Sequence, residues 1–241
     1  MIEIKLVDNP QDLQQVFRLR YTVYVEELGA RMEFADHERK EVREPWDETG
    51  DHLGAWINGE LAGCLRINYG GKSDLSEYQE FFDPILADKG TEGSLEEISV
   101  GSKFAVHPRH RGATLAVRLM QAFYIQLQEK NSRLNYLTCR PNLAGMYRKL
   151  GFEPCAPSFF HHEAGWLMPM VLVVQDYETL RQIKSPFADI CARYPINQAH
   201  ARTLRARLGA QCFQPAHLRK FSPLRRSVMF IEDCAVSSLA P

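Results

Sequence analysis

The chain has 241 residues, of which 45% are hydrophobic, enough for one large domain or for a domain with an extension. Its formal net charge of −1 argues against a protein that coats nucleic acid through bulk charge. The longest apolar run, Leu167 to Val174, is too short to cross a bilayer, and the N-terminus lacks a signal-peptide pattern. Six scattered cysteines show no metal-ligand spacing. We therefore expect a cytoplasmic protein with no metal site, no disulfide, no transmembrane segment and no nucleic-acid partner.

The N-terminal half predicts a strand, a helix and a hairpin. Residues 2–7 alternate in polarity, and Asp8-Asn9-Pro10 is a helix start signal for a helix over about 11–27. Residues 33–51 are acidic and turn-rich, with eight Asp or Glu against three Lys or Arg. Two strands, near 54–57 and 61–68, flank Asn58-Gly59, which is a strong hairpin signal. A short helix is expected near 75–82.

The central part of the chain alternates strands with helices. Strands are predicted over 98–106, 134–139 and 167–174, and helices over 111–129 and 142–150, the second closed by Gly151. This order indicates an α/β fold in which a mixed, largely antiparallel sheet is flanked by helices.

A boundary is predicted at Ser185-Pro186, which divides the chain into a main domain, 1–184, and a basic helical extension, 185–241. Residues 190–231 hold eight Lys or Arg and no Asp or Glu, with short helices expected near 197–208 and 215–220. Such a segment often contacts something acidic. The candidates are the chain's own residues 33–51, a membrane surface or an acidic carrier protein. Prolines and a glycine divide the segment, which counts against membrane binding.

The junction between the strand over 98–106 and the next helix predicts an anion site. The first amides of a helix are unpaired and the helix dipole favours an anion beside them. Gly112 allows a ligand to approach the main chain, and Arg109, His110 and Arg111 add positive charge. A phosphate or pyrophosphate fits such a site, although an ordinary solvated basic turn would also explain a single R-x-x-G pattern.

Further motifs surround this junction: Val106-x-Pro108-x-x-Arg111-Gly112-x-Thr114, then Leu119-Met120, then Asn142 and Tyr147-Arg148-Lys149-Leu150-Gly151-Phe152. Together they resemble the GNAT superfamily of N-acyltransferases, in which this loop binds the pyrophosphate of coenzyme A or the phosphate of a phosphopantetheine arm. The resemblance implies an acyl-phosphopantetheine donor, no permanently bound cofactor, and donor contacts from Val106, Arg111, Gly112, Ala113, Thr114 and Asn142. Thr114 departs from the pattern, which usually has Gly or Ala there.

The N-terminal half narrows the resemblance through Arg20-Tyr21-Thr22-Val23-Tyr24, Trp46-Asp47, His52 and Gly63-Cys64-Leu65-Arg66-Ile67. These residues look like those of N-acyl amino acid synthases, GNAT-fold relatives of the acyl-homoserine-lactone synthases, and the likeness covers about residues 10–190. In such enzymes a fatty acyl group moves from a carrier thioester to the amine of an amino acid. The resemblance implies an acyltransferase that uses acyl carrier protein or acyl-CoA and a small-molecule amine. Candidate acceptor contacts are Arg20, Trp46, Asp47 and Arg66, although an inward-facing Arg20 could instead form a buried ion pair with the acidic segment, residues 33–51.

Amide formation from a thioester needs a neutral amine, and a side-chain base can supply it. The resemblance places a glutamate where this chain has Val100, so the nearest acids are Glu96 and Glu97. In a regular strand Glu96 shares the face of Val106, whereas Glu97 does so only if a bulge intervenes, for which Gly101 is a candidate. We select Glu97 because Glu97-Ile98-Ser99 matches the family's local sequence. The alternative is that both carboxylates are solvated at the end of a strand.

The leaving thiolate needs a proton, and the resemblance implies Tyr147 as its donor, although a tyrosine packed between helix and sheet explains the residue equally well. A main-chain N–H near Val106 would hold the carbonyl oxygen. Three other functions stay open at this point: a short-chain N-acetyltransferase acting on a small amine, a catalytically inactive acyl-binding module, and nucleic-acid contact by the basic tail. The last lacks the aromatic residues that such contacts use.

Overall fold

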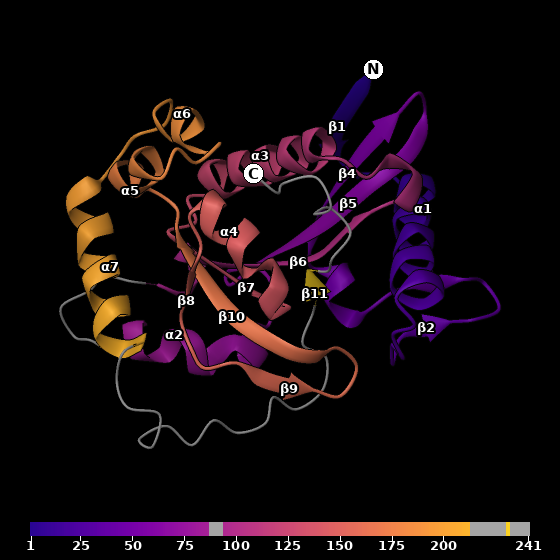
Figure 1. Cartoon of the computed structure of the whole chain (residues 1–241), viewed down its shortest axis with the longest axis horizontal. Helices are drawn as coiled ribbons and strands as arrows, with labels where there is room; N and C mark the ends of the chain where they lie inside the picture. The colour runs from indigo at the N-terminus through magenta and orange to yellow at the C-terminus, as the bar shows by residue number, and fades with distance from the viewer. Residues whose placement is uncertain (87–93, 213–229, 232–241) are drawn as a thin grey trace.

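The computed structural model describes residues 1–86, 94–212 and 230–231, and a nine-stranded sheet lies at its centre (Figure 1). The strand order is β1-β4-β5-β6-β11-β7-β10-β8, with β9 on β10, and the pairs are antiparallel except those that join β6, β7 and β11. The strands are β1 (Ile2–Leu6), β4 (Asp51–Ile57), β5 (Glu60–Tyr69), β6 (Ile98–Val106), β7 (Leu134–Cys139), β8 (Glu153–Pro154), β9 (Phe159–His161), β10 (Gly165–Val173) and β11 (Phe230–Ile231). The mixed, largely antiparallel sheet predicted from the sequence is confirmed.

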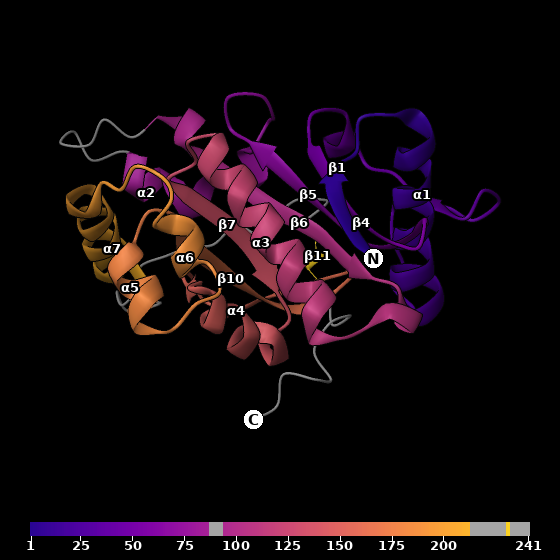
Figure 2. The same ribbon diagram turned by 90° about the horizontal axis from the view of Figure 1, so that it is seen from above.

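Helices cover both faces of this sheet. Helix α3 crosses one face, as Figure 2 shows, and an added Cβ on Gly63 of β5 would meet its Leu119. The next residue of β5, Cys64, points to the opposite face and lies beside Arg20 at the end of α1. The helices are α1 (Pro10–Arg20), α2 (Gln79–Leu86), α3 (Ala113–Glu129), α4 (Ala144–Leu150), α5 (Tyr177–Gln182), α6 (Ala188–Cys191) and α7 (Gln198–Cys212). The helix predicted over 11–27 is α1 continued by a π-helical segment, Tyr21–Glu27.

The β4–β5 hairpin follows the sequence prediction, and β6 departs from it at one point. Asn58 and Gly59 both have positive φ, which the tight turn between the two strands requires. In β6, Ala105 and Ser102 face Cys64 and Arg66 of β5, so β6 carries one extra residue between them. The bulge therefore lies at Lys103, whose φ is 54°, and the prediction that it lies at Gly101 is wrong.

Strands β6 and β7 pair at one end and separate at the other. Residues 98–100 of β6 pair with residues 134–136 of β7. Farther along, β11 lies between them, where Ile231 pairs with Phe104 on one side and with Cys139 on the other. We call this the open end of β6 and β7. There the main-chain groups of β6 and β7 do not pair with each other, and those of Phe104 and Cys139 pair with β11 instead.

The first part of the predicted extension packs onto the main domain. The ring of Phe187 is buried and stacks on Tyr124 of α3, with ring centroids 4.4 Å apart. The hydroxyl of Ser185 donates a hydrogen bond of 2.8 Å to the carbonyl of Leu150. Residues 185–191 therefore share the core of the sheet and α3. Helix α7 confirms the helix predicted near 197–208, whereas the one predicted near 215–220 lies outside the described residues.

The basic side chains of α7 bind acidic groups of the same chain. Arg205 contacts Asp176 at the start of α5 and Glu153 of β8, and Arg202 contacts Glu178 of α5. Within the described residues, the acidic partners of these two arginines are therefore carboxylates of β8 and α5 and not residues 33–51. Within the part of the chain that the structure describes, no helix is both long and apolar enough to cross a bilayer.

Candidate active site

Six titratable side chains lie buried together on the α1 side of the sheet. They come from distant parts of the sequence: the end of α1, the 3₁₀ turn Pro45–Glu48 and the residue before it, and strands β4, β5 and β6. We call them the buried charge cluster; its members are Arg20, Glu44, Asp47, His52, Arg66 and Lys103. Burial of so many charged groups is costly unless each is paired and hydrogen-bonded, so their contacts are the first question.

Asp47 joins the two arginines of the cluster. Its Oδ1 accepts a hydrogen bond of 2.8 Å from Nη1 of Arg20 and a second from Nη1 of Arg66. Its Oδ2 accepts from the main-chain N–H of Glu44 at 2.7 Å, which is one half of a capping box around the 3₁₀ turn. Burial alone would raise the pKa of Asp47, but the two guanidinium groups hold that pKa below its ordinary value.

Glu44 joins Arg66 to Lys103. Its Oε2 accepts from Nη2 of Arg66 at 2.8 Å, and its Oε1 lies 2.6 Å from Nζ of Lys103. Nε of Arg66 donates to the hydroxyl of Ser102 at 3.2 Å, so this arginine is bound on three sides. Burial lowers the pKa of Lys103, and Glu44 opposes that shift. The bulge in β6 is what turns the Lys103 side chain toward this glutamate.

The neutral member of the cluster is His52. Its Nδ1 lies 3.1 Å from Nη2 of Arg20, and because arginine can only donate, Nδ1 must accept. The proton therefore sits on Nε2, which lies 3.3 Å from the main-chain oxygen of Asp47. Burial and the neighbouring arginines lower the pKa of His52 to about 3. Three cations then face two carboxylates in the cluster, which leaves it with an excess of one positive charge.

The acceptor residues predicted from the sequence divide into two groups. Arg20, Asp47 and Arg66 lie together in the cluster, bound to one another. Trp46 lies beside it, where its ring packs on Tyr78 at a centroid distance of 6.0 Å. Sequence reasoning missed Glu44 and Lys103. The Glu44-x-x-Asp47 spacing around Pro45 is a capping-box signal that would have found the first. The second stands in Ser102-Lys103, which matches a Ser-Arg pair of the family that the chain resembles, but the sequence assigned it no role.

The predicted donor residues lie at the start of α3 and around it. Gly112 is the N-cap of α3, makes no side-chain cap, and an added Cβ there would meet nothing within 4 Å. Arg111 binds Glu27 of the π-helical segment, so its charge is shared with that carboxylate. Val106 is the buried last residue of β6, Thr114 is exposed in the first turn of α3, and Asn142 is exposed in the turn before α4. Ala113 begins the helix.

A cavity of about 440 Å³ lies between α3 and α4 and reaches Phe104 at the open end of β6. Its walls are mostly apolar, with two lysines, and are formed by Phe104, Ala116, Val117, Met120, Met146, Lys149, Leu150, Ile183, Lys184 and Pro186. A cavity with apolar walls and positive charge suits a flexible chain that carries a phosphate.

Neither of the two predicted catalytic residues is among those that line this cavity. Glu97 ends the 3₁₀ turn Leu95–Glu97 just before β6, with its carboxylate 3.4 Å from Nε of Arg133, near the end at which β6 and β7 are paired. Seven residues of strand separate it from Phe104, about 23 Å at 3.3 Å per residue. Tyr147 has no exposed surface and its ring packs edge-on against Phe152 at 5.7 Å. These positions give Glu97 no support as the base, and both catalytic assignments stay predictions.

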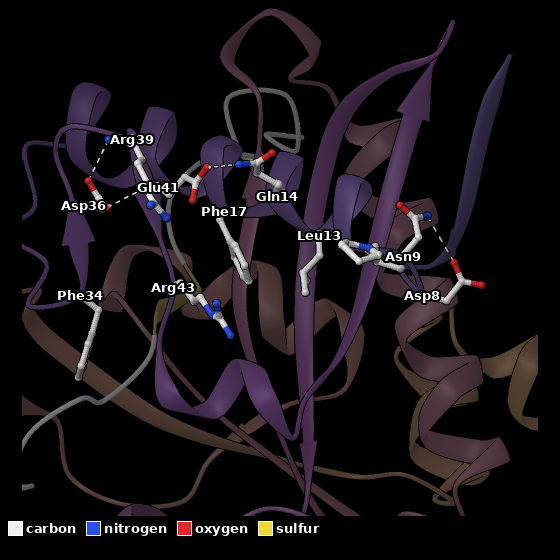
Figure 3. Close-up of a pocket in the computed structure, with 12 residues that line it drawn as sticks. Asp8, Asn9, Leu13, Gln14, Phe17, Phe34, Asp36, Arg39, Glu41 and Arg43 are labelled. Carbon is white, nitrogen blue, oxygen red and sulfur yellow. Dashed lines mark hydrogen bonds and ion pairs between the residues drawn. The ribbon is translucent and has the colours of Figure 1, made fainter.

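A second cavity, of about 710 Å³, lies between α1 and the hairpin of β2 (Ala35–Asp36) and β3 (Glu41–Val42). Figure 3 shows Leu13, Gln14 and Phe17 of α1 on one side and Arg39, Glu41 and Arg43 on the other. Phe17 lies between this cavity and the buried charge cluster. It lines the cavity, and the guanidinium of Arg20 lies 5.6 Å from its ring. In residues 1–86, 94–212 and 230–231, no group of three His, Cys, Asp or Glu is arranged to hold a metal ion.

Solved structures share this architecture. The structure of FeeM, an N-acyl amino acid synthase from uncultured soil microbes, superposes with a TM-score of 0.60 at 14% identity, over 76% of this chain and 96% of that one. BjaI, a CoA-dependent acyl-homoserine lactone synthase, gives 0.60 at 18% identity, over 86% and 100%. ElaA from Escherichia coli gives 0.51 at 21%, over 71% and 99%. At these identities the likeness establishes the fold, an α/β acyltransferase fold of the GNAT type. No curated protein matches in sequence.

The family follows from a different comparison. The family model described as N-acyl amino acid synthase FeeM matches residues 15–176, which is more than half of the chain. That range contains every member of the buried charge cluster, both strands at the open end, and the turn before α3. The chain belongs to the family of the N-acyl amino acid synthase FeeM, and it is an acyltransferase.

Proposed function

We propose that the protein transfers a long-chain acyl group from an acyl-phosphopantetheine thioester to the amine of an amino acid. The observation that carries this proposal is the excess positive charge of the buried charge cluster. Three cations against two carboxylates, with His52 neutral, favour a ligand that brings a carboxylate. An amino acid has such a group next to its amine, whereas a simple amine does not.

The donor side of the proposal rests on the cavity between α3 and α4. Its apolar walls and two lysines suit a phosphopantetheine arm, and the start of α3 beside Gly112 suits the phosphate. A donor arm that reached the open end of β6 and β7 would compete with β11 for the same main-chain groups. BjaI is CoA-dependent, and one of its structures contains isopentyl-CoA. Coenzyme A and acyl carrier protein both carry the acyl group on phosphopantetheine, so the proposal includes both as donors.

The test is to offer the purified protein three donors, palmitoyl-carrier protein, palmitoyl-CoA and acetyl-CoA, each with a mixture of amino acids and of simple amines that lack a carboxylate. Mass spectrometry then identifies the amides. We expect N-palmitoyl amino acids and no N-palmitoyl simple amines. Acetylated amines alone would make the protein a short-chain N-acetyltransferase, and no amide from any donor would leave an acyl-binding module. Either result would overturn the proposal.

A further inference from the structure

Glu77 holds a buried carboxyl oxygen that the structure leaves without a partner. The residue lies in the 3₁₀ turn Ser76–Tyr78, which leads into α2, and its side chain is half-buried. Its Oε2 has no contact with solvent and no hydrogen bond within the described part of the chain. Buried polar atoms are nearly always hydrogen-bonded, so an exception calls for an explanation.

Glu77 lies near the buried charge cluster, because the ring of the next residue, Tyr78, packs on Trp46, the neighbour of Asp47. The charged groups around Glu77 are Glu44 before the 3₁₀ turn Pro45–Glu48, Arg66 of β5, Lys103 of β6 and Asp74 of the loop that precedes Glu77 itself. Glu44, Arg66 and Lys103 are already bound to one another. Glu77 therefore lies next to these ion pairs and adds a carboxyl group that takes no part in them.

This place is next to the open end of β6 and β7. Lys103 immediately precedes Phe104, which pairs with β11 and also lines the cavity between α3 and α4. Tyr78, the residue after Glu77, is fully buried and packs on Trp46 and Phe81, which fixes the 3₁₀ turn against the core.

The environment also sets the carboxyl's protonation. Burial, with Glu44 and Asp74, raises the pKa of Glu77 to about 8, against the opposite effect of Arg66 and Lys103. An amino group of a free amino acid has a pKa near ~8, so a carboxyl tuned to that range exchanges protons with it at little cost in free energy.

We propose that Glu77 is the general base that removes a proton from the acceptor's ammonium group before acyl transfer. The inference rests on the proposed function, since it requires an amine acceptor. The ammonium gives one proton to the Glu77 carboxylate, which passes it to solvent. The neutral nitrogen attacks the thioester carbon, the N–C bond forms, and the C–S bond breaks with its electron pair left on sulfur. The second proton of the nitrogen ends on that sulfur.

The experiment compares pH–rate profiles of the wild type, Glu77→Gln and Glu80→Gln. Glu80 is a matched control, because it lies three residues away, is partly buried, and has a pKa that burial also raises. In the wild type kcat should rise with pH through about 8, as the carboxyl becomes ionised. Glu77→Gln should lower kcat by roughly 10²-fold or more, leave the donor KM unchanged and abolish that rise. Glu80→Gln should keep the wild-type kcat and its rise with pH.

The outcomes separate the inference from the function beneath it. An active wild type with an unaltered profile in Glu77→Gln overturns the role of Glu77 alone. A wild type that forms no amide with any donor overturns the proposed function and the role of Glu77 with it. If Glu77→Gln does not fold, ¹³C NMR titration of the glutamate carboxyls in the wild type decides instead. We expect one of them to titrate near 8, and titration of all of them near the ordinary 4.5 would overturn the inference.

Discussion

Asp47 binds Arg20 at 2.8 Å between Oδ1 and Nη1, and their side chains are 1% and 0% exposed. The same oxygen also accepts from Arg66, so one carboxylate neutralises parts of two buried guanidinium groups. This pairing is a condition for folding as well as for binding, because arginine stays charged inside a protein and needs a counter-charge there.

Asp47→Asn should therefore destabilise the protein strongly. The amide keeps the shape of the carboxyl but removes its charge, which leaves Arg20 and Arg66 buried with Glu44 as their remaining carboxylate in the cluster. We expect a loss of about 3–5 kcal/mol in the free energy of unfolding, the scale for breaking a buried ion pair. Urea denaturation measures it.

The matched control is Asp51→Asn, which changes a carboxylate paired with the exposed Lys72 at 3.2 Å. A pair of this kind contributes about 1 kcal/mol or less. Equal losses in the two variants would contradict a special role for the buried charge cluster.

The neutral state of His52 makes stability depend on pH. Its pKa of about 3 lies below the ordinary 6.5, so the unfolded chain binds a proton below pH 6.5 that the folded chain does not take up. This contribution to stability is complete above 6.5 and is lost as the pH falls toward 3. The slope should be about 1.4 kcal/mol per pH unit for this one proton.

His52→Gln should flatten that slope by one proton between pH 4 and 6, as measured by urea denaturation at each pH. At pH 8 neither the folded nor the unfolded chain protonates His52. The difference in the free energy of unfolding between the two proteins at that pH is therefore the cost of the substitution itself. Parallel slopes in the two proteins would show that His52 is charged in the folded state.

The elements predicted from the sequence were those with local signals. Strand β7 is buried throughout and has turns on both sides, and Asn58-Gly59 marks the β4–β5 hairpin by its positive φ angles. The position of the bulge was not predictable in this way. Glycine favours irregular strand backbone, which pointed to Gly101, but the structure uses Gly101 to make room for Phe123 and places the positive φ at Lys103. The ion pair of Lys103 with Glu44, 59 residues earlier in the chain, accompanies this backbone.

The residues of the candidate site were likewise predictable only where a local sequence signal marks them. Arg20, Asp47 and Arg66 could be predicted because they stand in motifs that resemble a known family, and the structure brings them together. Glu44 has only the local capping-box signal, and its ion pair with Lys103 joins distant segments, a contact that a single sequence does not reveal. Glu77 stands in the short helix predicted near 75–82, but no motif marks it, and its burial near the cluster is what distinguishes it.

Gly112→Asp should weaken donor binding while the protein stays folded. A Cβ at this position meets nothing within 4 Å, and φ of 167° is extended backbone that any residue adopts. The new carboxylate would stand at the start of α3, where the proposed function places the donor's phosphate. We expect the KM for the acyl donor to rise at least tenfold, with an unchanged melting temperature.

Gly112→Asn is the matched control, since asparagine has nearly the size of aspartate without its charge. It should raise the donor KM far less than Gly112→Asp does. A similar rise in both variants would mean that bulk rather than charge matters there, and no rise in either would remove the phosphate site from the start of α3.

The last prediction separates two roles of the basic helix α7. Arg205 contacts Asp176, which is 4% exposed, and Glu153, whereas the ion pair of Arg202 is with the exposed Glu178. Arg205→Glu would place a third carboxylate beside the first two. We expect the free energy of unfolding to fall by about 2 kcal/mol, or Tm by ~4–8 °C. The ratio of kcat/KM for the acyl-carrier donor to kcat/KM for the acyl-CoA donor should not change. Arg202→Glu should cost less than about 1 kcal/mol. If Arg205→Glu instead keeps its Tm and raises the KM for the acyl-carrier donor alone, the helix binds an acidic carrier protein, and its contacts with Asp176 and Glu153 are not what holds it in place.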